Sequence, residues 1–208
     1  MKSRFLFYSI IGGFWLCAVG AGMGTLWRYS TSAGEPAQAP RQWPFSSRLR
    51  PAPGLATLVM TIHPHCPCTR ATFDELARLM KQAQGAVEAQ VIFVKPAGMP
   101  MDWEKTDLWQ TAAKIPGVVV SCDEGGSEAA RFGAKTSGQV LLYNRQGQLI
   151  FSGGITAARG HSGDNAGSSA VVSLLRGETP QESETPVYGC PLFDPHDKCA
   201  ETNECFTR

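Results

Sequence analysis

Two thiols and two imidazoles are concentrated in one short stretch of the chain, His63-Pro64-His65-Cys66-Pro67-Cys68. If Cys66 is the N-cap of a following helix, Pro67 takes the first helical position, where its missing N–H costs nothing. The Cys66 sulfur then faces unpaired backbone N–H groups and the positive end of the helix dipole, which favour thiolate over thiol. The stretch therefore predicts a reactive cysteine, with Cys68 as its partner and His65 beside both.

The same residue types could instead bind a soft metal ion. Two thiolates one residue apart, together with His63, His65 or His161, form a sulfur and nitrogen site suited to Cu(I). All four histidines lie in this stretch, in the glycine-rich loop around residue 161 or in the cysteine-containing tail. Copper binding is therefore the alternative to thiol chemistry.

The remaining cysteines leave two interpretations open. Seven cysteines occur, and Cys17 lies in an apolar N-terminal segment. In an oxidising compartment the tail predicts a disulfide-stapled extension, with Cys199 paired to Cys205 or to Cys190. The sharper interpretation makes Cys190 a third redox thiol that resolves a mixed disulfide at the reactive cysteine. Cys122 follows an apolar strand and is expected to be a core or rim thiol.

A glycine-rich loop, residues 159–165, carries a further candidate group. Asp164 or Asn165 is expected to cap the helix that follows, which explains most of the loop. It does not explain His161, which could stabilise a thiolate, relay a proton or bind a metal. A surface histidine is the competing interpretation.

Alternating strands and helices must position these groups. Apolar runs and periodicities predict a strand over 54–63, a helix ending before Gly85, a strand over 87–94 and a helix over 102–115. They then predict a strand over 118–121, a short helix over 127–132, a hairpin over 139–152 and a last helix over 165–176. This order indicates an α/β fold with a mixed sheet covered on both faces. Ligands of such sheets sit where strands end and helices begin, which is the position of residues 63–68.

The N-terminus predicts a membrane anchor. Residues 5–27 carry no charged side chain, and a helix of that length covers about 35 Å, enough for a bilayer core of ~30 Å. Lys2 and Arg4 before it place the first residues in the cytoplasm and the rest outside. A cleaved signal peptide is the alternative. The expected organisation is an anchor over 1–28, a stiff proline-rich spacer over 29–53, a domain over 54–176 and a cysteine-containing extension over 177–208.

Charge argues against one class of partner. Lys and Arg total 19 against 18 Asp and Glu, so no basic surplus exists to bind nucleic acid.

From Ala52 to Arg176 the chain resembles the thioredoxin-like superfamily, in the branch that includes TlpA/ResA-type membrane-anchored thiol oxidoreductases and the peroxiredoxins. The matching features are the strand that ends in His63, the Cys-Pro-Cys start of the next helix, Phe132-Gly133 before the hairpin, and residues 141–147 with Gly153-Gly154 after them. More narrowly, the chain is similar to the exported bacterial group labelled RedB, because it contains the motif His-Pro-x-Cys-Pro-Cys-Thr-Arg.

The resemblance implies disulfide exchange in the periplasm by a single-pass protein of the bacterial inner membrane. Its partners would be protein thiols or disulfides and a membrane redox partner, and no cofactor is required. Cys66 would attack and Cys68 would be its partner. The expected supporting residues are Thr69, Arg70, Gly138, Arg159 and His161.

Two departures from the superfamily pattern affect this expectation. One residue, rather than two, separates the cysteines, so a Cys66–Cys68 disulfide would distort the first turn and favour an oxidant or isomerase. Ser137-Gly138 stands where the family has a cis-proline that discourages metal at the thiols, which leaves metal binding open. A peroxiredoxin-like peroxidase ranks last, because His63 stands where those enzymes have threonine.

Overall fold

The computed structural model describes residues 2–193, which divide into two compact units, the first ending at Ser32 and the second beginning at Ala33. The first unit is helix α1 (Lys2–Thr31). Its segment Arg4–Thr31 is long and apolar enough to cross a membrane, as a signal sequence also would be. The chain therefore has the candidate membrane span that its sequence predicts.

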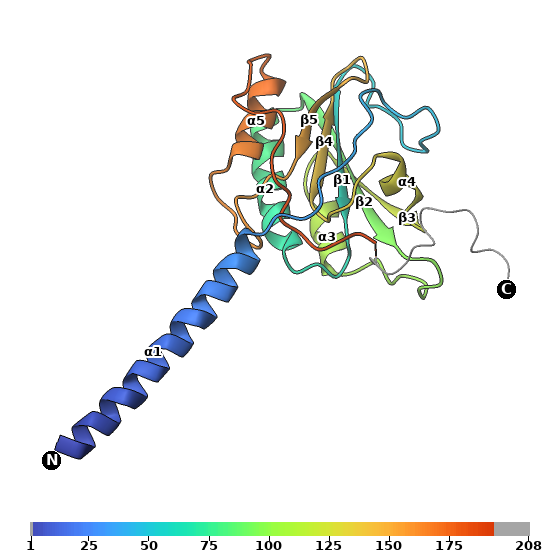
Figure 1. Ribbon diagram of the computed structural model, residues 1–208. Coiled ribbons are helices and arrows are strands. Elements are labelled where there is room, and N and C mark those ends of the chain that lie inside the picture. The colour runs from blue at the N-terminus through green and yellow to red at the C-terminus, as the bar shows by residue number, and fades with distance from the viewer. Residues whose placement is uncertain (1, 194–208) are drawn as a thin grey trace. The chain divides into compact units, whose positions relative to one another are not determined.

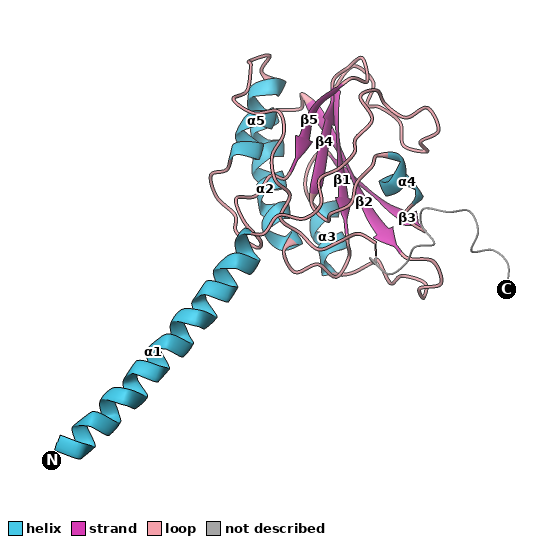
Figure 2. Cartoon of the chain, viewed as in Figure 1, coloured by secondary structure: helices cyan, strands magenta, loops and turns pink. Residues whose placement is uncertain are grey.

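The second unit is built on one five-stranded sheet (Figures 1 and 2). Its strands are β1 (Ala56–Ile62), β2 (Val87–Lys95), β3 (Val118–Glu124), β4 (Gln139–Tyr143) and β5 (Leu149–Gly153), in the order β3-β2-β1-β4-β5. β1, β2 and β3 are parallel, whereas β4 pairs antiparallel with both β1 and β5. The expected mixed sheet with a terminal hairpin is confirmed.

Helices cover both faces of this sheet, as Figure 1 shows. α2 (Thr69–Ala83), α3 (Asp107–Ala113) and α5 (Ala166–Leu175) share one core with it, and α4 (Ser127–Arg131) lies toward the other face. Because side chains alternate along a strand, Leu58 and Met60 pack toward α2 while Val59 packs with Phe132 on the opposite side. The carboxyl end of β1 is thereby fixed beside the start of α2.

Two element boundaries differ from the sequence prediction by more than two residues. The helix expected from residue 102 begins at Asp107, because Asp102 has a left-handed backbone (φ 64°) and forms a turn closed by the Lys105 N–H at 2.9 Å. β3 runs on to Glu124, so Cys122 lies within the strand and its thiol is exposed. This is the rim position rather than the core position for that cysteine.

The expected spacer is instead largely packed on the domain. Its residues 34–50, here termed the strap, pair with the sheet side through the Gln38 N–H to the Gly133 carbonyl and the Trp43 N–H to the Gly147 carbonyl (2.9 and 2.8 Å). Four strap residues cover the sheet face that the short α4 leaves open, namely Ala37, Ala39, Trp43 and Leu49. The apolar area that they bury explains why this proline-rich segment does not hang free.

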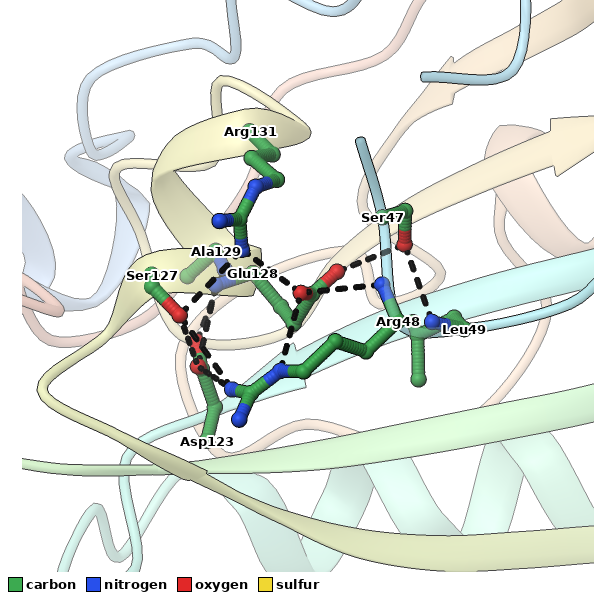
Figure 3. Close-up of polar contacts among 8 residues, drawn as sticks. All are labelled: Ser47, Arg48, Leu49, Asp123, Ser127, Glu128, Ala129 and Arg131. Atoms are coloured by element: carbon green, nitrogen blue, oxygen red, sulfur yellow. Dashed lines mark hydrogen bonds and ion pairs between the residues drawn. The ribbon is translucent and has the colours of Figure 1, made fainter. Parts of the chain in front are cut away.

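Carboxylates fasten the far end of the strap to α4 (Figure 3). The buried Glu128 carboxylate accepts hydrogen bonds from the Ser47 hydroxyl (2.6 Å), the Arg48 N–H (3.2 Å) and the Arg131 guanidinium (2.7 Å). Burial raises the pKa of Glu128, but the hydrogen bonds from Ser47 and Arg48 lower it further, and its pKa lies below the ordinary value. Asp123, also buried, accepts the first N–H groups of α4.

Candidate functional site

Two consecutive turns carry the chain from β1 into α2. The Cys66 N–H donates to the His63 carbonyl, and the Thr69 N–H donates to the Cys66 carbonyl, both at 3.1 Å. Pro64 and Pro67 each occupy the second position of a turn, where their fixed φ is favourable. Helix α2 therefore begins at Thr69 with Cys68 as its N-cap. The prediction that Cys66 would be the N-cap and Pro67 the first helical residue is wrong, because a second turn intervenes.

The two sulfurs are buried at this junction. Cys66 is 1% exposed and Cys68 is 7% exposed, whereas Pro67 between them is exposed. Both cysteines are free thiols, as is Cys190 in the tail. A substrate cannot reach the sulfurs without some movement of the residues that cover them.

Four hydrogen-bonding groups lower the pKa of Cys66. They are the thiol and the backbone N–H of Cys190, the hydroxyl of Thr69 and the backbone N–H of Cys68. Burial raises the pKa of Cys66, but these hydrogen bonds outweigh it, so its pKa lies below the ordinary value for a thiol. The expected thiolate thus has direct donors from two separate segments, one of which is the tail.

The pKa values of the other two thiols, Cys68 and Cys190, lie above the ordinary value for a thiol. Burial and the neighbouring Cys66 raise the pKa of Cys68, against an opposing effect of the Arg159 guanidinium. Burial and the same neighbour raise the pKa of Cys190 to about 12, again opposed by Arg159. Of these three thiols, Cys66 is thus the one whose pKa is lowered, and the Arg159 cation acts on the other two.

Cys190 is held at the site by its backbone. The tail segment, residues 187–192, lies antiparallel to residues 135–137: the Ser137 N–H donates to the Cys190 carbonyl (2.8 Å) and the Leu192 N–H to the Lys135 carbonyl (2.9 Å). Val187 and Leu192, at the two ends of the segment, are both buried. The tail is a packed wall of the site along this length.

Ser137 joins the tail to the cysteine turn. Its hydroxyl accepts the His63 N–H at 2.9 Å and lies 3.4 Å from the Thr69 hydroxyl, while its own N–H holds Cys190. The adjacent Gly138 donates its N–H to the Thr61 carbonyl at 2.8 Å with φ of 88°, a conformation that favours glycine. Ser137 and Gly138 thus position both thiol-bearing segments.

Arg159 reaches the thiols from the loop that follows β5. Its guanidinium donates to the Gly189 carbonyl and interacts with Cys68 and Cys190. The loop is tied to α2 by the buried carboxylate of Glu75, which accepts the Gly163 N–H at 2.6 Å. Sequence reasoning included Arg159 and missed Glu75, whose long-range partner leaves no local signal.

The histidines lie beside the thiols rather than among their described contacts. The rings of His63 and His65 pack on Trp103, with centroids 5.8 and 4.5 Å away, and the His65 N–H donates to His63 Nδ1 at 3.2 Å. Burial, with a smaller effect of the neighbouring His65, lowers the pKa of His63. His161 is exposed, and its Nδ1 lies 2.9 Å from the Arg159 carbonyl. Trp103, which positions the two rings, was not anticipated.

Other expected residues are placed as follows. Arg70 forms an exposed ion pair with Asp107 at 2.5 Å, so its charge is directed to α3. Asn165 is the N-cap of α5, with its side chain accepting the Ser168 N–H at 2.8 Å, as expected. Cys199 and Cys205, with their expected disulfide, lie outside the described residues.

Metal ligands are not preassembled in the described part of the chain. Within residues 2–193, no three His, Cys, Asp or Glu side chains lie close enough together to hold a metal ion. The donor set expected for Cu(I), two cysteines with His63 or His161, would therefore need a rearrangement to form.

Comparison with known proteins bears on the fold. No protein family and no curated protein matches the chain. Two solved structures resemble it: an uncharacterized conserved protein from Geobacillus kaustophilus (TM-score 0.57, 20% identity, covering 79% of this chain and 94% of that one) and a hypothetical protein from Sinorhizobium meliloti (TM-score 0.56, 22% identity, 78% and 94%). A secreted disulfide oxidoreductase from Mycobacterium tuberculosis is more distant (TM-score 0.38, 16% identity, 47% and 67%).

The mixed five-stranded sheet with its flanking helices fits the thioredoxin-like fold that the sequence resemblance implied.

Proposed function

We propose that this protein is a membrane-anchored thiol:disulfide oxidoreductase in which Cys66 is the attacking thiolate. The observation that carries the proposal is that Ser137 holds Cys190 beside the turn that carries Cys66, where hydrogen-bond donors from Cys190, Thr69 and Cys68 lower the pKa of Cys66. A structural thiol in a core needs no such donors, whereas a nucleophile requires its anionic form at neutral pH.

The surrounding charges fit this chemistry. Arg159 next to Cys68 and Cys190 favours the anionic form of whichever thiol loses its proton when a disulfide forms. The buried turn and the tail restrict access, so exchange begins with a movement that exposes Cys66. An exposed substrate disulfide on another protein is the reactant that this arrangement suits.

We place this activity on the outer side of the bacterial inner membrane, in the manner of the TlpA/ResA and RedB proteins that the sequence resembles. The apolar helix α1 and the positive residues that precede its core support an anchor with the domain in the periplasm. The electrons would come from, or go to, a membrane redox partner. No cofactor enters the proposed reaction.

The test uses the full chain in detergent. It is equilibrated in glutathione buffers of graded potential, alkylated, and each cysteine is quantified by mass spectrometry. We expect Cys66 to titrate as one half of a two-electron couple, and the midpoint gives the direction of electron flow. If Cys66 stays reduced while the exposed Cys122 reacts, the oxidoreductase proposal is wrong.

Copper analysis of the same preparation, purified without chelator, addresses the alternative. A Cu(I) chaperone or sensor would retain near-stoichiometric copper and would lose it on replacement of His161. Among the described residues no three His, Cys, Asp or Glu side chains are arranged to hold a metal ion, so a copper site would need Cys66, Cys68 and either Cys190 or a histidine to move. We therefore do not favour this alternative.

A further inference from the structure

We propose that the redox partner of Cys66 is Cys190, so that the oxidised protein carries a Cys66–Cys190 disulfide and Cys68 remains a thiol. This inference rests on the proposed function and assigns the second cysteine of the couple. Of the two roles that the sequence left open for Cys190, it takes the resolving thiol rather than the structural disulfide, and it replaces Cys68 as the expected partner of Cys66.

The backbone holds Cys190 beside the cysteine turn, because the Ser137 N–H donates to the Cys190 carbonyl while the Ser137 hydroxyl accepts the His63 N–H. The Arg159 guanidinium donates to the adjacent Gly189 carbonyl. In this position the side chain and the backbone N–H of Cys190 lower the pKa of Cys66. Contacts from three segments, at Cys66, Ser137 and Arg159, thus meet at Gly189 and Cys190.

The tail packs closely against the loop that carries Ser137. An added Cβ on Gly189 would collide with the Ser137 carbonyl oxygen. Only glycine therefore allows the tail backbone to come this near to the loop that carries Ser137. Such a close approach immediately before Cys190 fixes the position of its sulfur, whereas an extension that merely covers the domain has no need of it.

Cys68 is the competing partner for Cys66. Cys66 and Cys68 flank Pro67 within a single turn that is closed by the Thr69 N–H. A disulfide between them would have to form across a residue of fixed φ and would break that turn. Cys190 comes from a different segment, and its sulfur can move onto Cys66 while the turn stays intact.

The reaction balances with a protein disulfide as oxidant. The Cys66 thiolate attacks one sulfur of the substrate, which forms a mixed disulfide and releases one substrate thiolate, protonated by solvent. The Cys190 thiol then loses its proton to solvent and attacks the Cys66 sulfur, which releases the second substrate thiolate. Two electrons pass from Cys66 and Cys190 to the substrate disulfide.

The test uses the reduced full chain in detergent, with one equivalent of glutathione disulfide as the substrate probe. After an acid quench and alkylation, non-reducing peptide mapping identifies the disulfides. We expect a Cys66–Cys190 disulfide in the unmodified protein, in Cys68→Ser and in a Cys199→Ser/Cys205→Ser double variant. A Cys66–Cys68 disulfide, or Cys190 joined to Cys199 or Cys205 in the unmodified protein, would overturn the proposal.

One variant distinguishes a failure of the oxidoreductase proposal from a failure of the Cys66–Cys190 pairing. Cys190→Ser should accumulate glutathione on Cys66 at least tenfold over the unmodified protein, because no thiol resolves the mixed disulfide. If Cys66 in this variant takes up no glutathione, the oxidoreductase proposal itself fails. If it takes up glutathione only as much as the unmodified protein does, Cys66 is a nucleophile but Cys190 is not its partner.

Gly189→Ala keeps every thiol and displaces only the tail backbone. We expect it to lose the Cys66–Cys190 disulfide and to accumulate the mixed disulfide, as Cys190→Ser does. The matched control is Ser183→Ala, an exposed side chain earlier in the same tail, which should behave as the unmodified protein. Formation of the Cys66–Cys190 disulfide at the normal rate in Gly189→Ala would show that the docked tail is not what brings the sulfurs together.

Discussion

The carboxylate of Glu75, buried in α2, accepts a hydrogen bond from the backbone N–H of Gly163 at 2.6 Å. This contact joins the helix that begins at the thiols to the loop that carries Arg159. Arg159 is the cation that acts on Cys68 and Cys190. Its position thus depends on Glu75, an acidic residue that lies outside the thiol cluster.

Replacing Glu75 by Gln should loosen that loop. A buried hydrogen bond to a charged acceptor contributes about 1.5–3 kcal/mol, so unfolding in urea should show a loss of this size. Because Arg159 moves with the loop, the alkylation profile of Cys68 should also shift to higher pH. The control is Asp74→Asn, an exposed neighbour on the same helix. A loss of stability without any change in the Cys68 profile would assign Glu75 a purely structural role.

Arg159→Gln should slow exchange directly. The guanidinium opposes the upward pKa shifts of Cys68 and Cys190, so its removal raises both pKa values further. Fewer molecules then carry the second thiolate, and the mixed disulfide at Cys66 should persist longer. Rapid quench with mass spectrometry measures its lifetime. Arg145→Gln, in the exposed hairpin turn, is the control, and an equal effect in both variants would refute a local role for Arg159.

The pH dependence of Cys66 alkylation should reveal its donors. The thiolate is the reactive form, and the pKa of Cys66 is below the ordinary thiol value, so its reaction with iodoacetamide should continue to lower pH than that of Cys122. Cys190→Ala removes one donor and should raise the pKa of Cys66. Below the pKa, each unit of increase lowers the reactive fraction about tenfold.

Cys190→Ser is the matched variant for this experiment, because a hydroxyl can still donate to the Cys66 sulfur. It should keep a lower Cys66 pKa than Cys190→Ala does, although neither variant can form the disulfide. Identical profiles for the two variants would mean that the Cys190 side chain does not stabilise the thiolate.

The Glu128 contacts should make the strap sensitive to acid. The pKa of Glu128 is lowered in the folded protein, so its contribution is present above the unfolded-state value of about 4.3 and is lost as the pH falls through the folded value. Glu128→Gln should cost about 1.5–3 kcal/mol at pH 7 and less at pH 3. Urea unfolding at several pH values measures this difference. The exposed Glu124→Gln serves as control.

Periodicity in the sequence predicted the strands and helices because each is a local pattern of apolar side chains. The N-cap of α5 was predicted as Asp164 or Asn165, because capping depends on the local residue type, and it is Asn165. The strap was not, since Trp43 and Leu49 are isolated in a proline-rich stretch, and only the uncovered sheet face explains their burial.

The candidate site likewise combines local features, which could be predicted from the sequence, with long-range contacts, which could not. A lowered pKa of Cys66 was expected from the local motif, although the hydrogen bonds that lower it are not those of a helix N-cap. The meeting of Cys66 with Cys190 depends on backbone pairing between the tail and residues 135–137, which no short stretch of sequence encodes. Glu75 and Gly189 were missed because their roles exist only once distant segments are packed together.

Two hydrogen bonds at the start of the strap determine which fragment of the chain can keep the thiol site intact. The Gly34 N–H donates to the Val187 carbonyl at 2.8 Å, and the Thr136 hydroxyl donates to the Glu35 carbonyl at 2.8 Å, so the start of the strap supports the tail and the loop before Ser137. A fragment trimmed to the helices and strands, residues 54–176, would keep Cys66 and Cys68 but lose the wall that shields them and the third sulfur. A fragment that keeps the third sulfur in place therefore needs both the strap and the tail segment 187–192, and both are almost without regular secondary structure.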